Sequence, residues 1–196
     1  MTLTVRTMMT AADTDTSDAA LLEATGAGDL AAFERLHRRF HRRLFGFAQR
    51  LTDRPELAEE VVSDTMLAVW RGASGFRGDS RPSTWIFGIA YRVAMRALSK
   101  TAHEKLHDEI DDEIEADRSG TDEVETLMQR RHIVAALRSL PPHQRATVEL
   151  TYFYGYRLTE IAEITGCPVG TVKTRMFHAR ARLKGLLAGQ LQEVGQ

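Results

Sequence analysis

The feature that most constrains the fold of this chain is a basic segment, residues 169–184, that follows a short amphipathic segment, residues 158–166, ending in glycine. The basic segment holds five lysine or arginine residues and no aspartate or glutamate. Its apolar residues recur at helical spacing, so that one face packs and the other is basic: Val172, Met176, Ala179 and Leu183. Two helices joined by a glycine turn, the second basic, are typical of a helix-turn-helix that inserts its second helix into the DNA major groove.

The length and composition of the chain favour two small globular domains. It has 196 residues, of which 43% are hydrophobic and 27% charged, an ordinary balance for such a protein. The single cysteine, Cys167, rules out an internal disulfide and fits a cytoplasmic location. No apolar run approaches the roughly 18 residues needed to cross a bilayer, so we expect no membrane insertion. Residues 1–17 lack the apolar core of a signal peptide and are predicted to be a disordered tail. Residues 189–196 are predicted to be a C-terminal tail.

Hydrophobic periodicity predicts only helices, which makes the fold class all-α. Four helices are expected in the first half of the chain, at about residues 18–25, 29–51, 55–71 and 85–100. Asp18 and Asp29 are the expected N-caps of the first two, and Ser83 or Thr84 of the fourth. In the second half, helices are expected over residues 124–140 and 143–154 before the helix-turn-helix, with Thr159 as the cap of its first helix.

The third predicted helix carries an acidic strip on its exposed face. The strip consists of Glu59, Glu60, Ser63, Asp64 and the apolar Leu67. Acidic side chains around an exposed leucine suit a protein-docking face, but a face that serves only solubility has the same composition. Both interpretations remain open from the residues alone.

The loop at residues 72–82 and the helix after it combine aromatic and basic side chains. Arg92, Arg96 and Lys100 recur every four residues and project from one face. The aromatic residues among them are Trp85, Phe87 and Tyr91. Aromatic side chains beside a cationic groove bind single-stranded nucleic acid by stacking on its bases. Core packing is the alternative role for each aromatic residue.

Residues 101–123 are predicted to form an acidic linker between the domains at residues 18–100 and 124–188. From Thr101 to Glu125 there are eleven acidic residues and two basic ones, a composition typical of a flexible connection. The linker contains the string His-Glu-Lys-Leu-His at residues 103–107, which on a buried helix binds zinc in metallopeptidases. Because its flanks are acidic and almost without apolar residues, we expect neither a metal site nor a cofactor. His132 and His143 are expected to be surface or capping residues, and Cys167 a small buried thiol.

Two blocks of sequence together resemble the extracytoplasmic-function (group 4) sigma factors of bacterial RNA polymerase. The first domain resembles their region 2 at residues 29–36, 58–65 and 83–90. The second resembles their region 4 at residues 140–145, 160–162 and 167–175. The resemblance implies a region 2 helical bundle and a region 4 helix-turn-helix joined by the acidic linker, in a protein that is not an enzyme.

The resemblance also implies partners and site residues. Region 2 would bind the coiled coil of the largest polymerase subunit through the acidic strip, and region 4 the flap of the second-largest subunit. Region 2 would open the −10 element of promoter DNA through the following residues: Phe76, Arg77, Ser83, Thr84, Trp85, Tyr91, Arg92 and Arg96. Region 4 would contact the −35 duplex through a second set: Thr171, Lys173, Thr174, Arg175, Phe177, His178 and Arg180. An anti-sigma factor is the expected inhibitor.

Some positions depart from the family pattern. Residues 90–92 read Ala-Tyr-Arg where the family commonly has Ala-Arg-Asn, and His178 stands where arginine is frequent. The main alternative is a helix-turn-helix regulator that binds DNA without polymerase, which leaves the Trp85 helix and the acidic strip unexplained. The second alternative is the zinc peptidase. Binding to core polymerase distinguishes the first from a sigma factor, and metal analysis tests the second.

Overall fold

The computed structural model describes residues 17–105 and 132–193, and over these residues it contains helices and no strand. The helices are α1 (Asp18–Gly26), α2 (Leu30–Thr52), α3 (Pro55–Gly72), α4 (Pro82–Lys105), α6 (Pro142–Tyr152), α7 (Leu158–Thr165) and α8 (Val169–Glu193), with a short 3-10 turn, η2 (Ala73–Gly75). Residues 132–138 are also helical. The prediction of an all-α fold is confirmed. Most of the predicted linker and N-terminal tail lies outside the described residues.

Of the two N-caps predicted for the first two helices, Asp29 is confirmed and Asp18 is wrong. Asp29 caps α2, where its carboxylate accepts a hydrogen bond from the backbone N–H of Ala32 at 3.1 Å. The cap of α1 is Ser17 rather than Asp18, because the Ser17 hydroxyl accepts from the N–H of Ala20 at 3.2 Å. Asp18 instead pairs with Arg39 of α2 at 3.0 Å and holds α1 against it.

Helix α4 begins earlier and ends later than the periodicity predicted. It starts at Pro82, so Ser83 and Thr84 lie in its first turn and neither is the cap. Proline suits this position because its fixed φ matches a helix and its missing N–H would have no partner there. The helix continues to Lys105, since no glycine or proline interrupts residues 101–105. Helix α8 likewise continues to Glu193, into the segment predicted to be a tail.

The helix-turn-helix is fixed by a carboxylate at one end of α7 and a glycine at the other. The Glu160 side chain accepts a hydrogen bond from the backbone N–H of Arg157 at 2.9 Å, so Glu160 rather than Thr159 satisfies this helix start. Gly166 follows α7 with φ 63°, a left-handed conformation that glycine adopts without a Cβ clash. The turn then aims α8 away from α7.

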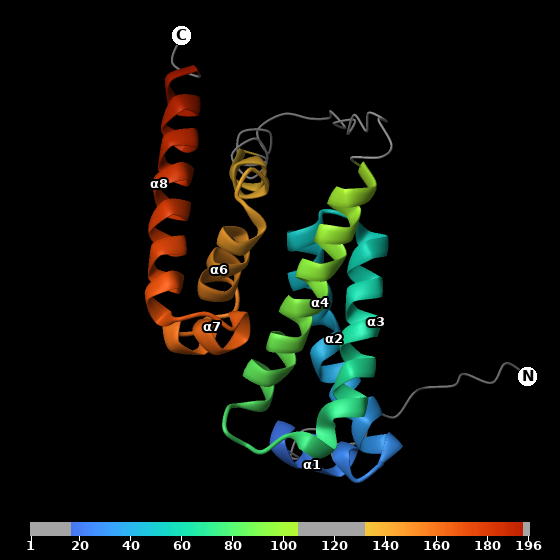
Figure 1. Ribbon diagram of the computed structural model, residues 1–196. Coiled ribbons are helices and arrows are strands. Elements are labelled where there is room, and N and C mark those ends of the chain that lie inside the picture. The colour runs from blue at the N-terminus through green and yellow to red at the C-terminus, as the bar shows by residue number, and fades with distance from the viewer. Residues whose placement is uncertain (1–16, 106–131, 194–196) are drawn as a thin grey trace, which may run out of the picture.

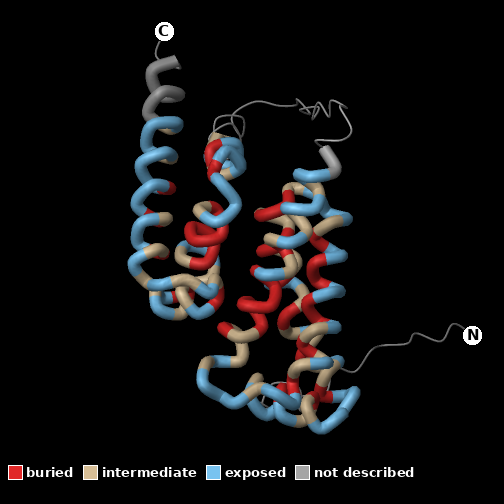
Figure 2. The backbone as a smooth tube through the Cα atoms, in the orientation of Figure 1, coloured by how far each residue is buried: buried red, intermediate tan, exposed pale blue. Residues whose placement is uncertain are grey.

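One hydrophobic core runs through most of the described residues. The N-terminal bundle, α1 to α4, buries Phe40 and Phe47 of α2 completely. The same cluster continues into the C-terminal unit, α6 to α8, through Leu150, Ile161 and Ile164. Figure 1 shows the C-terminal unit alongside α4, with α8 outermost. In Figure 2 the buried segments of α4 and α6 face one another, while the outer side of α8 is exposed.

Candidate nucleic-acid interface

Helix α8 presents one buried and one exposed side, as its sequence predicted. Val172, Met176 and Ala179 are buried against α6 and α7. The exposed side contains five of the predicted −35 residues, namely Lys173, Thr174, Phe177, His178 and Arg180. Phe177 exposes 69% of its surface, and its ring meets His178 edge-on with 5.5 Å between centroids. A helix face that combines cations with a protruding aromatic ring has the chemistry for phosphates and base edges.

A groove borders this exposed face on the side of α6. Apolar and basic side chains line it together: Leu158, Lys173, Met176, Phe177, Arg180 and Lys184. The Arg180 guanidinium donates to the Tyr152 hydroxyl, with Nη2 at 2.8 Å and Nε at 3.1 Å. This contact holds Arg180 against the rim of the groove. Its charge is therefore positioned before any ligand arrives.

Arg175 lies on another side of α8 from Lys173 and Phe177. It is half-buried, with Nη1 3.5 Å from the Cys167 sulfur. Its charge lies close enough to Tyr91 of α4 to oppose the rise in the pKa of that hydroxyl, which burial causes. Thr171 is also only partly exposed. The structure thus divides the predicted −35 set into an exposed group of five and an inner pair.

The first predicted −10 residues lie together before α4. The rings of Phe76 and Trp85 pack with 5.4 Å between centroids. Gly72 lies beside Trp85, since a Cβ built on it would meet the indole at 3.4 Å, an ordinary van der Waals distance. Arg77 is exposed and pairs with Asp79 at 2.9 Å.

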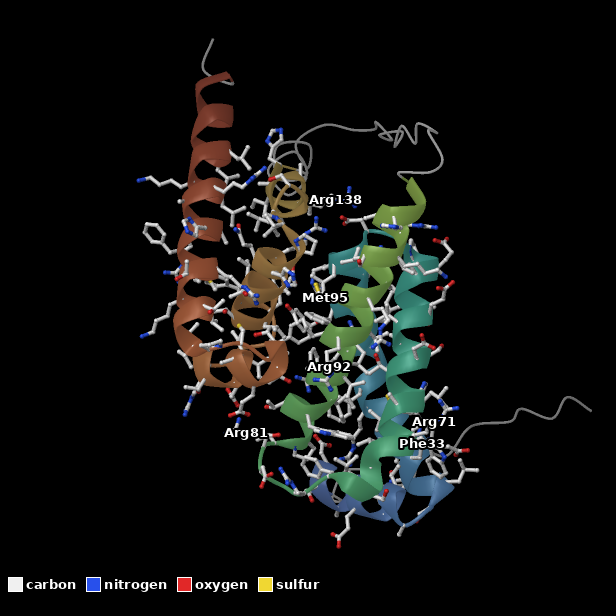
Figure 3. The ribbon with its side chains drawn as sticks, in the orientation of Figure 1. Phe33, Arg71, Arg81, Arg92, Met95 and Arg138 are labelled. Atoms are coloured by element: carbon white, nitrogen blue, oxygen red, sulfur yellow. The ribbon has the colours of Figure 1, made fainter. Side chains whose placement is uncertain are left out.

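The remaining −10 residues separate into exposed and covered groups. Arg92 and Arg96 are exposed on α4. Tyr91 retains 5% exposure, and its hydroxyl lies 2.6 Å from Nδ1 of His143 in α6. Thr84 is buried at 2% exposure, and its hydroxyl has no hydrogen-bond partner. Figure 3 shows Arg81, Arg92 and Met95 on the part of α4 and its preceding loop that borders the C-terminal unit.

The acidic strip of α3 is exposed along its whole length, and its two edges have different neighbours. Glu59 turns toward α2, where its carboxylate lies 3.6 Å from Nε2 of His41. Glu60 and Asp64 line a groove between α3 and α4 together with Arg96 and Lys100. Leu67 exposes 45% of its surface. The strip therefore has a histidine-facing edge and an edge beside the basic side chains of α4.

A row of ring side chains on α2 borders the Glu59 edge. Phe33, His37, His41 and Phe45 follow one another at four-residue spacing. Phe33 also meets Trp70 of α3 edge-on at 5.1 Å between centroids. Burial, and then the neighbouring His41, lower the pKa of His37. The i, i+4 spacing of these residues was a visible signal that the sequence analysis did not use.

A network of charged side chains between the two units was not predicted at all. Asp53 accepts hydrogen bonds from Arg138 at 2.8 Å and Arg145 at 2.7 Å. Arg50 pairs with Glu149 at 2.5 Å and donates to the Tyr154 hydroxyl at 2.6 Å. Burial raises the pKa of Glu149, while the Arg50 charge opposes that rise. Burial also raises the pKa of Tyr154 to about 12.

Metal binding finds no support in the described part of the chain. Over residues 17–105 and 132–193, no group of three or more histidine, cysteine, aspartate or glutamate side chains is placed to hold a metal ion. Of the string at residues 103–107, His107 and Leu106 lie outside the described residues. None of the helices in the described ranges is long and apolar enough to cross a membrane.

Comparisons with known proteins match both halves of the chain. The family model for Sigma-70 region 2 matches residues 36–104, and the model for Sigma-70, region 4, matches residues 130–183. The ECF RNA polymerase sigma factor SigM of Mycobacterium tuberculosis (strain ATCC 25618 / H37Rv) is 37% identical over 171 residues, which cover 87% of this chain and 85% of SigM. The chain belongs to the extracytoplasmic-function (ECF) sigma factors. The family resemblance inferred from the sequence is confirmed.

Other ECF and related sigma factors are similar over most of their length. The RNA polymerase sigma-H factor of Pseudomonas aeruginosa is 29% identical over 190 residues, covering 92% of this chain and 98% of that protein. The sigma factor RpoE of Bartonella quintana, solved with the anti-sigma factor NepR, has a TM-score of 0.56 at 27% identity. The match covers 75% of this chain and 91% of the RpoE chain. CnrH, solved with the cytosolic domain of CnrY, has a TM-score of 0.65 at 24% identity. The match covers 88% of this chain and 97% of the CnrH chain. This last likeness concerns the fold.

Proposed function

We propose that this ECF sigma factor binds core RNA polymerase and directs transcription to particular promoters, with region 4 on the −35 element and region 2 opening the −10 element. The observation that carries the proposal is the match of both regions, in order, on one chain. A DNA-binding regulator without polymerase would need only the helix-turn-helix. The two regions provide two separate contacts with promoter DNA.

Region 4 binds duplex DNA through the exposed face of α8 in this proposal. Lys173, Phe177 and their exposed neighbours contact base edges, since they occupy the outward face. Arg180 is held at the rim by Tyr152 and contacts phosphate. Phosphate contacts set the position of the helix, and base contacts select the sequence.

Region 2 holds the opened strand through the loop before α4 and the exposed arginines of that helix. Phe76 and Trp85 supply ring surfaces in contact with each other, and Arg92 and Arg96 supply positive charge. Extruding a base costs a few kcal/mol, and stacking with phosphate neutralisation offsets that cost.

The acidic strip of α3 is the proposed docking face for the coiled coil of the largest polymerase subunit, and region 4 docks on the flap of the second-largest. Leu67 offers an exposed apolar contact amid acidic side chains. Control by an anti-sigma factor is proposed because the similar RpoE was solved with one.

Co-purification with core polymerase, followed by in vitro transcription of genomic fragments, tests the proposal. We expect a stable complex with core polymerase and start sites that require the added protein. Duplex DNA binding without any polymerase complex would instead establish the regulator alternative.

A further inference from the structure

The groove between α3 and α4 carries charges of both signs, and only its acidic residues belong to the proposed docking strip. We propose that the whole groove is a mixed-charge docking site that receives one helix of the coiled coil of the largest polymerase subunit. The site rests on the proposed function, because its partner is the polymerase. It adds a basic half, from α4 and from the start of α3, to the acidic strip.

The groove follows the line along which α3 and α4 pack, and its volume is about 360 Å³. Figure 1 shows these two helices side by side. The floor of the groove is apolar and consists of Leu57, Val61, Val93 and Ala97. Val61 is 2% exposed, and the other three are half-buried. The floor therefore offers apolar surface to a partner while the core beneath it stays closed.

The charged side chains of the groove are acidic on one helix and basic on the other. Three carboxylates come from α3 and two cations from α4, and a third cation directly precedes α3. In that order they are Glu56, Glu60, Asp64, Arg96, Lys100 and Arg54. All six side chains are exposed. The groove thus combines an apolar floor with rims of opposite charge.

A groove with this lining suits a protein rather than nucleic acid. The backbone of DNA is uniformly negative, so the three carboxylates of α3 would oppose it at close range. Small-molecule sites of similar volume are mostly apolar with only a few polar groups, and six exposed charges do not fit that pattern. A helix that carries both acidic and basic side chains complements both rims.

A coiled coil presents helices of this kind. The positions beside its apolar seam are often glutamate and lysine, so both charges recur on its surface at helical spacing. Glu60 and Asp64 line the groove and also belong to the acidic strip. A helix bound to the strip at these two residues therefore also lies against the basic rim on α4. Binding of a helix in a groove between two others is a common recognition mode.

Helix α4 then has two functional halves. The half near its start carries the proposed −10 contacts Trp85 and Arg92, and the half near its end faces the carboxylates of α3 and binds protein. Arg96 lies at the boundary, because it lines the groove and also belongs to the −10 set. Lys100 and Arg54 line the groove and are outside the −10 set. Replacing these two residues therefore tests the groove without removing a proposed DNA contact.

Charge reversal on the basic side of the groove provides the first test. Lys100→Glu and Arg54→Glu should each weaken binding to immobilised core polymerase about tenfold, because each sets a negative charge against an acidic side chain of the partner. Arg54 is the N-cap of α3, where negative charge is favoured, so Arg54→Glu retains that helix. Arg42→Glu, on an exposed position of α2 outside the groove, makes the same change in net charge and should bind like the wild type.

Surface plasmon resonance measures these affinities, and urea unfolding verifies that each variant is folded. Equal affinity of the wild type and all three variants overturns the mixed-charge site and leaves the proposed function in place. Failure of the wild type itself to bind core polymerase overturns both.

A DNA probe separates a protein site from a nucleic-acid site. Holoenzymes assembled at saturating core polymerase are mixed with a fluorescent single strand that has the non-template −10 sequence of a promoter mapped by transcription with this protein. Lys100→Glu should bind this strand like the wild type. Arg92→Glu should bind it more weakly, which shows that the probe responds to the loss of one cation. Weaker strand binding by Lys100→Glu assigns the groove to DNA and overturns the proposal.

Photo-cross-linking identifies the partner directly. The photoreactive amino acid p-benzoylphenylalanine, placed at Thr101 in the lining of the groove, should cross-link to the coiled coil of the largest subunit in the holoenzyme. Placed at Arg42, it should give no such product. Mass spectrometry locates the cross-linked peptide. A holoenzyme that cross-links from residue 101 only to another subunit, or to none, overturns the choice of partner.

Discussion

Phe177 is a large apolar side chain that contributes little to the core, since 69% of its surface is exposed between the buried Met176 and Ala179. Phe177→Ala should change the free energy of unfolding by less than about 0.5 kcal/mol. It should reduce −35 duplex affinity by about tenfold, equivalent to about 1.4 kcal/mol, within the range of a base contact. Urea unfolding and fluorescence anisotropy measure the two effects, and core polymerase binding should be unchanged. A large loss of stability would show that Phe177 packs instead.

Lys173→Ala provides the matched comparison for a cation on the same face. If Lys173 neutralises a phosphate, its removal weakens binding to all sequences and lowers the salt slope by about one. If it contacts a base edge, the loss is confined to the cognate element. Anisotropy over a salt series with cognate and scrambled duplexes separates the two roles.

His143, whose ring is hydrogen-bonded to Tyr91 of α4, should make the docking of region 4 on region 2 depend on pH. Burial, and then the charge of Arg175, lower the pKa of His143 below its usual 6.5. A separated, solvated His143 therefore binds its proton more readily than the docked one. Docking should be complete above pH 6.5 and weaken as the pH falls through and below that value. Small-angle X-ray scattering between pH 7.5 and 5.5 measures this, and His143→Gln should remove most of the change.

At the scale of the helix, the acidic strip of α3 carries the proposed polymerase contact. Charge reversal in Glu60→Lys with Asp64→Lys should weaken core polymerase binding about tenfold or more, because like charge at a contact costs several kcal/mol. Glu23→Lys with Glu34→Lys, on exposed positions of α1 and α2, is the control, because it changes the net charge by the same amount. Surface plasmon resonance with immobilised core polymerase measures the affinities. Equal effects of the two changes would place the docking face elsewhere.

Helices with a strong apolar stripe could be predicted from the sequence to within one or two residues. The stripe of α2, with Leu36, Phe40, Leu44 and Phe47 buried, is a clear example. Helix starts were harder to predict: Ser17 rather than Asp18 caps α1, and α4 begins at Pro82, ahead of the expected caps Ser83 and Thr84. Local hydrogen bonding that spacing does not encode decides between them.

The −35 residues were assigned from the family resemblance, and the exposure of five of the seven agrees with the periodicity, because a helix of known buried stripe has a known outer face. The covered position of Tyr91 could not be predicted in the same way. Its partner His143 is 52 residues away, and Arg50 and Glu149 are separated by 99. Such pairs depend on how two units pack, which one sequence without related sequences does not specify.

At the scale of the whole molecule, the shared core couples the two regions. Ile161 and Ile164 of region 4 belong to the same buried cluster as the helices of region 2. We expect the wild-type protein to unfold in a single calorimetric transition, whose calorimetric and van't Hoff enthalpies agree. Gly88 of α4 lies against the Ile164 backbone of α7, where a Cβ would be 3.6 Å from the carbonyl oxygen. Gly88→Leu should therefore separate the regions and divide the unfolding into two transitions, while Gly88→Ala adds only an ordinary contact and keeps one. Two transitions in the wild type would show that the regions are thermodynamically independent.

At Asp53, backbone strain and ion pairing have opposite effects on stability. It ends α2 with φ 58°, a left-handed conformation that costs an aspartate of the order of 1 kcal/mol more than a glycine. Region 2 alone would therefore be more stable with glycine here, but the carboxylate that receives Arg138 and Arg145 would be lost. In a relative whose two regions do not pack together, glycine at residue 53 should be favoured, and in one whose regions pack as here, the acid should be favoured. The identity of this single residue should accordingly report, among close relatives, whether the two regions pack against one another.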